Sequence, residues 1–65
     1  MLKKNLMEYS AFVYQQNELF IADCSTLNFV TYGNNELEAV KELEKTIKEA
    51  FNKSDISVKP IYERR

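Results

Sequence analysis

The sequence predicts an α+β domain with the element order β-β-β-α-β. Three observations support this prediction. Aromatic and β-branched residues dominate three short segments before residue 33, apolar residues recur every three or four positions between residues 36 and 51, and strand-like alternation returns after residue 55. The expected architecture is an antiparallel three-stranded meander plus a fourth edge strand, with one helix packed on the sheet. At 65 residues the chain has room for one domain, residues 1–65.

The first three strands are predicted at Leu6–Gln15, Leu19–Cys24 and Leu27–Tyr32. The polar segments between them are of hairpin length, and such short connections join antiparallel neighbours, because parallel neighbours need a long crossover. The first strand carries apolar side chains on both of its faces. This pattern indicates a central strand, or a strand covered by a second subunit.

A helix is predicted to begin at Glu36 and to end at the polar residues 52–55. Its apolar stripe is predicted to consist of Leu37, Val40, Leu43, Ile47, Ala50 and Phe51. A fourth strand follows at Ile56–Tyr62. Because Pro60 has no N–H to donate, this strand is expected to lie at a sheet edge or to fray after Lys59.

The only glycine, Gly33, stands between the third strand and the helix. A phosphate-binding loop needs several glycines, and the carboxylates of Glu36 and Glu38 at the helix start would repel a phosphate. We therefore interpret this segment as a structural corner. Gly33 is expected to supply a positive φ or a tight exit from the strand, while Asn35 and Glu38 have the spacing of a helix-capping box.

The composition argues against most kinds of catalysis. The chain has no histidine, which is the commonest general base and metal ligand, and no serine or lysine stands in a recognisable nucleophile motif. We predict no catalytic residue, no cofactor and no metal site. A residual nuclease would need several convergent carboxylates. Metal-dependent cleavage that Asp23→Asn abolishes would reveal such an activity.

Charge and cysteine content bound the partners and the compartment. The net charge is −1, and no Lys or Arg occurs between Asn5 and Glu38, so the strand aromatics make a poor platform for single-stranded nucleic acid. We interpret them as core and subunit contacts. No membrane segment is apparent, and the lone Cys24 indicates a reducing, cytoplasmic setting. Because so short a chain builds a marginal core, self-association as a dimer or tetramer is expected.

The run L-F-I-A-D-C-S-T-L-N-F-V-T-Y-G-N-N-E-L-E-A-V, residues 19–40, resembles the HicB-like antitoxin family. The positions that match the family pattern are Ala22, Cys24, Leu27, Val30, Thr31, Gly33, Glu38 and Ala39. Ser25 replaces the family's proline, and Asn34-Asn35 replace its Asp-Thr. The resemblance implies a partial ribonuclease-H-like fold and the toxin-binding N-terminal domain of an antitoxin. It does not extend to that family's DNA-binding domain.

The leading functional hypothesis is a non-catalytic protein-binding module, an antitoxin-like HicB-type domain that associates with itself and binds a small basic ribonuclease toxin. The acidic helix residues Glu38, Glu42 and Glu49 are the candidate contacts with a basic partner, since charge complementarity steers encounter. The same residues also fit a plain solvated surface.

The alternative hypothesis is a small dimeric nucleic-acid-binding regulator. It would use the basic residues at the two ends of the chain, which are Lys3, Lys4, Arg64 and Arg65. A steep loss of affinity for oligonucleotides with added salt would support it.

Overall fold

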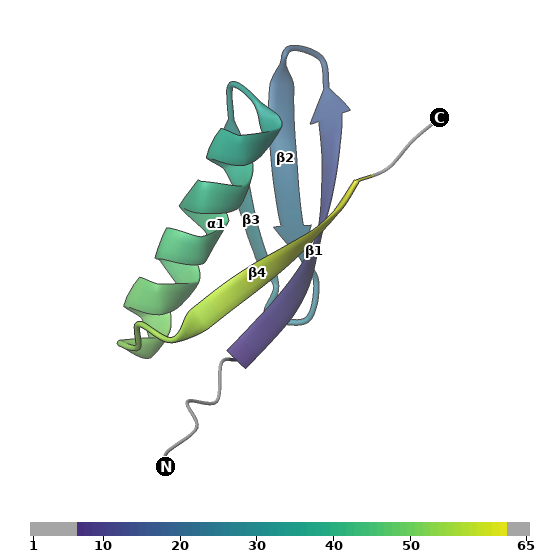
Figure 1. Ribbon diagram of the computed structural model, residues 1–65. Helices are drawn as coiled ribbons and strands as arrows, with labels where there is room; N and C mark the ends of the chain where they lie inside the picture. Colours follow the sequence, from purple (N-terminus) through teal and green to yellow (C-terminus); the bar gives the residue numbers. More distant parts are fainter. Residues whose placement is uncertain (1–6, 63–65) are drawn as a thin grey trace.

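The computed structural model describes residues 7–62. Its elements are β1 (Met7–Gln16), β2 (Leu19–Cys24), β3 (Phe29–Gly33), α1 (Glu36–Phe51) and β4 (Ile56–Tyr62) (Figure 1). The predicted α+β class and the order β-β-β-α-β are confirmed. The basic residues Lys3, Lys4, Arg64 and Arg65 lie outside the described residues.

The four strands form one sheet in the order β3-β2-β1-β4. β1 pairs with β2 and β2 with β3 in antiparallel fashion, so the predicted meander is present. β4 pairs with β1 in parallel, from Met7–Ile56 to Val13–Tyr62, which makes the sheet mixed. β1 is central and β4 lies at an edge, as its proline required, and β4 continues past Lys59 to Tyr62.

Both hairpins depend on an asparagine in the left-handed region of backbone space. Asn17 (φ 59°) begins the two-residue loop between β1 and β2, and Asn28 (φ 63°) ends the loop between β2 and β3. In that second loop the N–H of Leu27 donates to the carbonyl oxygen of Cys24 at 3.2 Å. The third strand therefore begins at Phe29 and not at Leu27, because Leu27 and Asn28 complete the turn. Asparagine tolerates this conformation better than most residues, which explains how these turns form without glycine.

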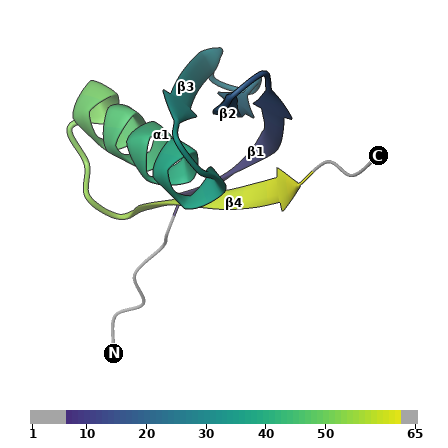
Figure 2. The ribbon, with the colours of Figure 1, turned by 90° about the horizontal axis from the view of Figure 1, so that it is seen from above.

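Helix α1 lies against one face of the sheet (Figures 1 and 2). Its buried residues are Ala39, Leu43 and Ile47, and Val40 is partly buried. They belong to a core cluster with these buried sheet residues: Ala11, Val13, Ala22, Cys24 and Ile56.

The predicted apolar stripe of the helix is wrong at three positions. Leu37 is 66% exposed, Ala50 is exposed, and Phe51 is 37% exposed although its ring contacts Tyr9. Ala39, which the prediction left out, faces the core. The cause is the junction with β3, where the backbone of Ala39 passes directly against Gly33. This close approach sets the rotation of the helix about its axis, and that rotation turns Leu37 away from the sheet.

Candidate protein-binding face

The side of the sheet opposite α1 is the largest candidate for a functional surface. Successive side chains of a strand point to opposite faces, so β1 directs Ala11 and Val13 to the core and Phe12 and Tyr14 to the other side. Within residues 7–62, no helix or strand covers that other side (Figure 2). We call it the open face and define it by its apolar side chains, which strand register places together: Phe12, Tyr14, Leu19, Ile21, Val30, Tyr32 and Ile61.

The open face is organised in rows across the strands. Tyr14, Ile21 and Tyr32 are direct neighbours on β1, β2 and β3. Ile21 is only 5% exposed although no helix covers it, because a tyrosine flanks it on each side. In the next row Phe12 has Ile61 on one side and Asp23 on the other. The row of Tyr14, Ile21 and Tyr32 therefore forms a small apolar cluster on this face, separate from the core beneath α1.

Much of the chain's aromatic surface remains outside the core. None of its four tyrosines and four phenylalanines is fully buried within the described structure. On the open face, Phe12 is 45% exposed, Val30 47% and Tyr32 58%. Contiguous exposed apolar patches on a folded chain commonly mark contact surfaces for other polypeptides, for membranes or for ligands.

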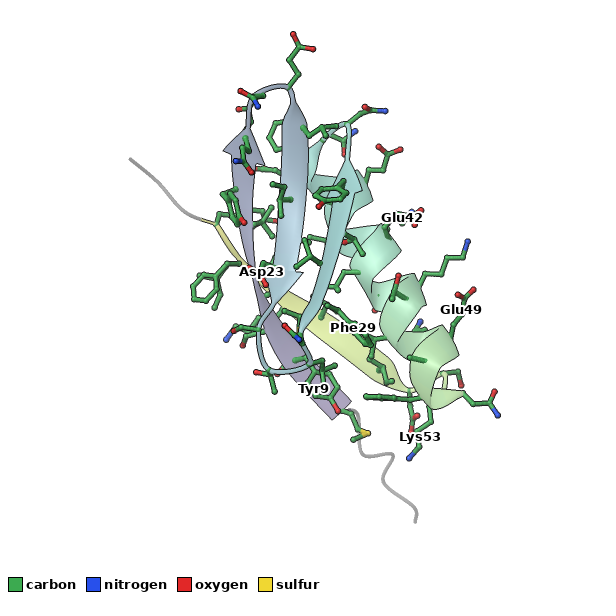
Figure 3. The ribbon with its side chains drawn as sticks, turned by 180° about the vertical axis from the view of Figure 1, so that it is seen from behind. Tyr9, Asp23, Phe29, Glu42, Glu49 and Lys53 are labelled. Carbon is green, nitrogen blue, oxygen red and sulfur yellow. The ribbon has the colours of Figure 1, made fainter. Side chains whose placement is uncertain are left out.

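The structure does not gather the carboxylates that a nuclease would require. Asp23 is half-buried on β2, and its cross-strand neighbours are Phe12 and Val30 (Figure 3). Glu8 is on the same face but four residues along β1 from Phe12, about 13 Å away at the usual rise of a strand. Glu18 is in the hairpin loop at the other end of β1. Among residues 7–62 there is no group of three or more potential metal ligands.

The three acidic residues predicted on the helix do share one exposed side of α1. Figure 3 shows Glu42 and Glu49 directed away from the sheet. Glu38 is committed to the helix cap, and the spacing of the helix places Lys45 between Glu42 and Glu49. The surface is therefore mixed in charge and not purely acidic, which weakens its attraction for a basic partner.

The helix start forms the predicted cap. The N–H of Glu38 donates to Oδ1 of Asn35 at 2.8 Å, and Oε1 of Glu38 accepts from the N–H of Asn34 at 2.5 Å. Thr31 adds a link between strand and helix, because its hydroxyl donates to the carbonyl oxygen of Ala39 at 2.9 Å. Three side chains thus bond backbone groups at the corner that joins β3 to α1.

Gly33 does not have the positive φ that was one of its two expected roles. The other role, a tight exit from the strand, is correct. A Cβ at this position would lie 2.5 Å from the backbone nitrogen of Ala39 and 2.9 Å from the carbonyl carbon of Glu38. Glycine is required here because the backbone of α1 lies against the backbone of β3 and leaves no room for a Cβ. The requirement therefore comes from tertiary packing and not from the φ angle of Gly33.

The other chemically notable residue is a core residue. Cys24 is a free thiol, fully buried in the core cluster. The part of the chain that the structure describes contains no pocket, and none of its helices is long and apolar enough to cross a membrane. The open face is the most extensive exposed apolar surface of these residues.

Sequence reasoning identified the strand aromatics but missed their assembly into one face. The available signal was the alternation of Phe12 and Tyr14 along β1 and of Val30 and Tyr32 along β3. Which of these side chains become neighbours depends on the strand order and the register, and the sequence of a single strand determines neither.

Comparison of the chain with protein-family models, with curated proteins and with solved structures finds no match.

Proposed function

We propose that this protein is a non-catalytic protein-binding module whose open face contacts other polypeptides. This proposal rests on one observation: large apolar side chains lie side by side on that face and remain exposed. Phe12, Val30 and Tyr32 are each about half exposed. Asp23 is the only charged residue in the two rows, where it lies beside Phe12, and residues 12–32 contain no Lys or Arg. Lys59 on β4 faces the same side, two residues from Ile61. A mainly apolar surface with so little positive charge favours protein partners over nucleic acid.

The specific form of this proposal is a cytoplasmic HicB-type antitoxin-like domain that associates with itself and binds and neutralises a small basic ribonuclease toxin. Support comes from the element order β-β-β-α-β and from the resemblance carried by residues 19–40. The surface formed by Glu42 and Glu49 on α1 is a second contact site that would steer a basic partner toward the domain. Within the described residues, the alternative nucleic-acid-binding regulator is supported on the open face only by Lys59.

Affinity purification tests the proposal. The tagged protein is purified from its native cells, and we expect a small basic protein to co-elute at near-stoichiometric yield. The ribonuclease activity of that partner should fall when the purified protein is added back. Phe12→Ser on the open face should abolish co-elution, whereas Leu37→Ser, an equivalent change at an exposed leucine on α1, should leave it intact.

Other outcomes have clear meanings once circular dichroism has shown that both variants are folded. A third protein carries both Glu42→Gln and Glu49→Gln. If this protein loses the partner while Phe12→Ser retains it, the contact lies on α1 and the proposed role of the open face is wrong. Binding of oligonucleotides with a steep salt dependence, and no protein partner, would replace the proposal with the regulator hypothesis.

A further inference from the structure

The sheet has two edges, and they differ in how they are protected. β4 forms one edge and carries Lys59 at its centre, followed by Pro60. Lysine and proline are the usual means by which an edge strand avoids pairing with another chain. β3 forms the other edge with the sequence F-V-T-Y-G, which has no charge and no proline, and its neighbours Asn28 and Asn34 are uncharged too.

We propose that two copies of the protein associate through the free edge of β3, antiparallel and centred on Thr31. The two four-stranded sheets would then join into one continuous sheet across a two-fold axis. This inference rests on the self-association in the proposed function and names the surface and register for it.

The residues of β3 are complementary to themselves in this register. Val30 lies opposite Tyr32 of the second copy, and Tyr32 opposite Val30 of the second copy, so two β-branched–aromatic pairs form on the joined open faces. On the helix side, Phe29 lies opposite Gly33 of the second copy. The same kind of aromatic–glycine pair already exists within one copy, where Phe20 lies opposite Gly33.

The charges of the two edges point to the same choice. β3 contains no charged residue, so no like charges meet when the strand pairs with a second copy of itself. The same operation on β4, centred on its middle residue, would place two Lys59 side chains directly opposite each other, which is unfavourable. It would also place Pro60, which has no N–H, in the new ladder.

The size of the contact sets the expected affinity. A five-residue edge strand buries less than the roughly 800 Å² per partner of a standard stable interface. We therefore expect weak association, with a dissociation constant in the micromolar range or above. A second copy is a suitable occupant because its own β3 supplies both members of each side-chain pair.

Cysteine cross-linking tests the register directly. In the proposed pairing, residue 30 of one copy faces residue 32 of the other with Cα atoms about 4.5–5.5 Å apart, within disulfide reach. Two residues 30 lie on a diagonal about 7–8 Å apart, which is too far for a disulfide. A mixture of Val30→Cys and Tyr32→Cys proteins should therefore cross-link under mild oxidation, and neither variant should cross-link efficiently alone.

Two controls accompany this experiment. The parent protein contains only the buried thiol of Cys24 and should give no cross-link. Leu37→Cys, which places an exposed thiol on α1, should not cross-link with Val30→Cys. Sedimentation should show a concentration-dependent dimer, and Tyr32→Lys, which alters both symmetric pairs, should weaken it by about tenfold.

The outcomes separate this inference from the proposed function. A protein that stays monomeric, or that cross-links residue 30 to itself, overturns the β3 register even if the open face still captures a toxin. Cross-links from Val30→Cys to another protein in place of a second copy also overturn it. Efficient cross-linking between positions 30 and 32 in a protein that captures no toxin would support this inference while the antitoxin proposal fails.

Discussion

At the scale of single residues, the corner between β3 and α1 depends on the absence of a side chain at Gly33. Backbone atoms of Glu38 and Ala39 occupy the space that a Cβ would need. Backbone cannot yield as a flexible side chain can, so any substitution must push the helix away from the strand. The hydroxyl of Thr31 and the cap formed by Asn35 then hold the two elements in this close approach.

Gly33→Ala should therefore lower the free energy of unfolding by about 1–3 kcal/mol, and Gly33→Val should lower it further. Urea denaturation measures the change. Asn34→Ala, one residue away with an exposed side chain, is the matched control and should stay within about 0.5 kcal/mol of the parent. A Gly33→Ala protein as stable as the parent would contradict the contact between the two backbones.

The capping residue gives a second test at this scale. Asn35→Ala removes the acceptor for the N–H of Glu38 and should cost about 1 kcal/mol. Asn35→Asp keeps an acceptor and adds a negative charge at the helix start, so its stability should remain close to that of the parent. Thermal unfolding of both variants checks this pair, and equal losses in the two would show that the side-chain acceptor does not stabilise the helix.

At the scale of elements, the orientation of α1 separates two leucines of the same helix. Leu43 is fully buried between helix and sheet, whereas Leu37 is largely exposed in the first turn. The helix packs through Ala39, Leu43 and Ile47, which follow one another at four-residue intervals. A small residue at position 39 lets the start of the helix lie close to β3, and the larger residues fill the space farther along the sheet.

Leu43→Ala should cost about 2–5 kcal/mol, which is a large part of the stability of so small a domain. Leu37→Ala makes the same chemical change at an exposed position and should alter the unfolding free energy by less than about 0.5 kcal/mol. Denaturant titration of the two variants gives the comparison. Similar losses would mean that the helix is rotated about its axis relative to the orientation described above.

At the scale of the whole molecule, the core is small for the amount of apolar side chain that the sequence contains. A chain of this length buries roughly 60% of its unfolded surface. The largest fully buried side chains are Leu43, Ile47, Val13 and Cys24, and no aromatic ring is among them. The proposed association with a second copy would add apolar contact that the single chain does not supply, and it would stabilise only the folded state.

If two copies associate as proposed, the midpoint of thermal unfolding should rise with protein concentration, because the second copy would bind the folded chain and not the unfolded one. Scanning calorimetry over about two decades of concentration measures this dependence. Tyr32→Lys should show a lower midpoint that changes less with concentration. A midpoint that is independent of concentration in the parent protein would contradict self-association.

Local sequence patterns alone determined the order of the elements, the antiparallel meander, the cap at Asn35 and the edge position of β4. Each of these depends on residues close together in the chain, through alternation, helical spacing or the missing N–H of proline. The tertiary structure alone decided the parallel pairing of β4 with β1, the rotation that exposes Leu37, the reason for Gly33 and the assembly of the open face. These features depend on which segments, distant in the sequence, become neighbours in space. A local pattern predicts which face of a strand or helix is apolar, but it does not predict which element packs against that face.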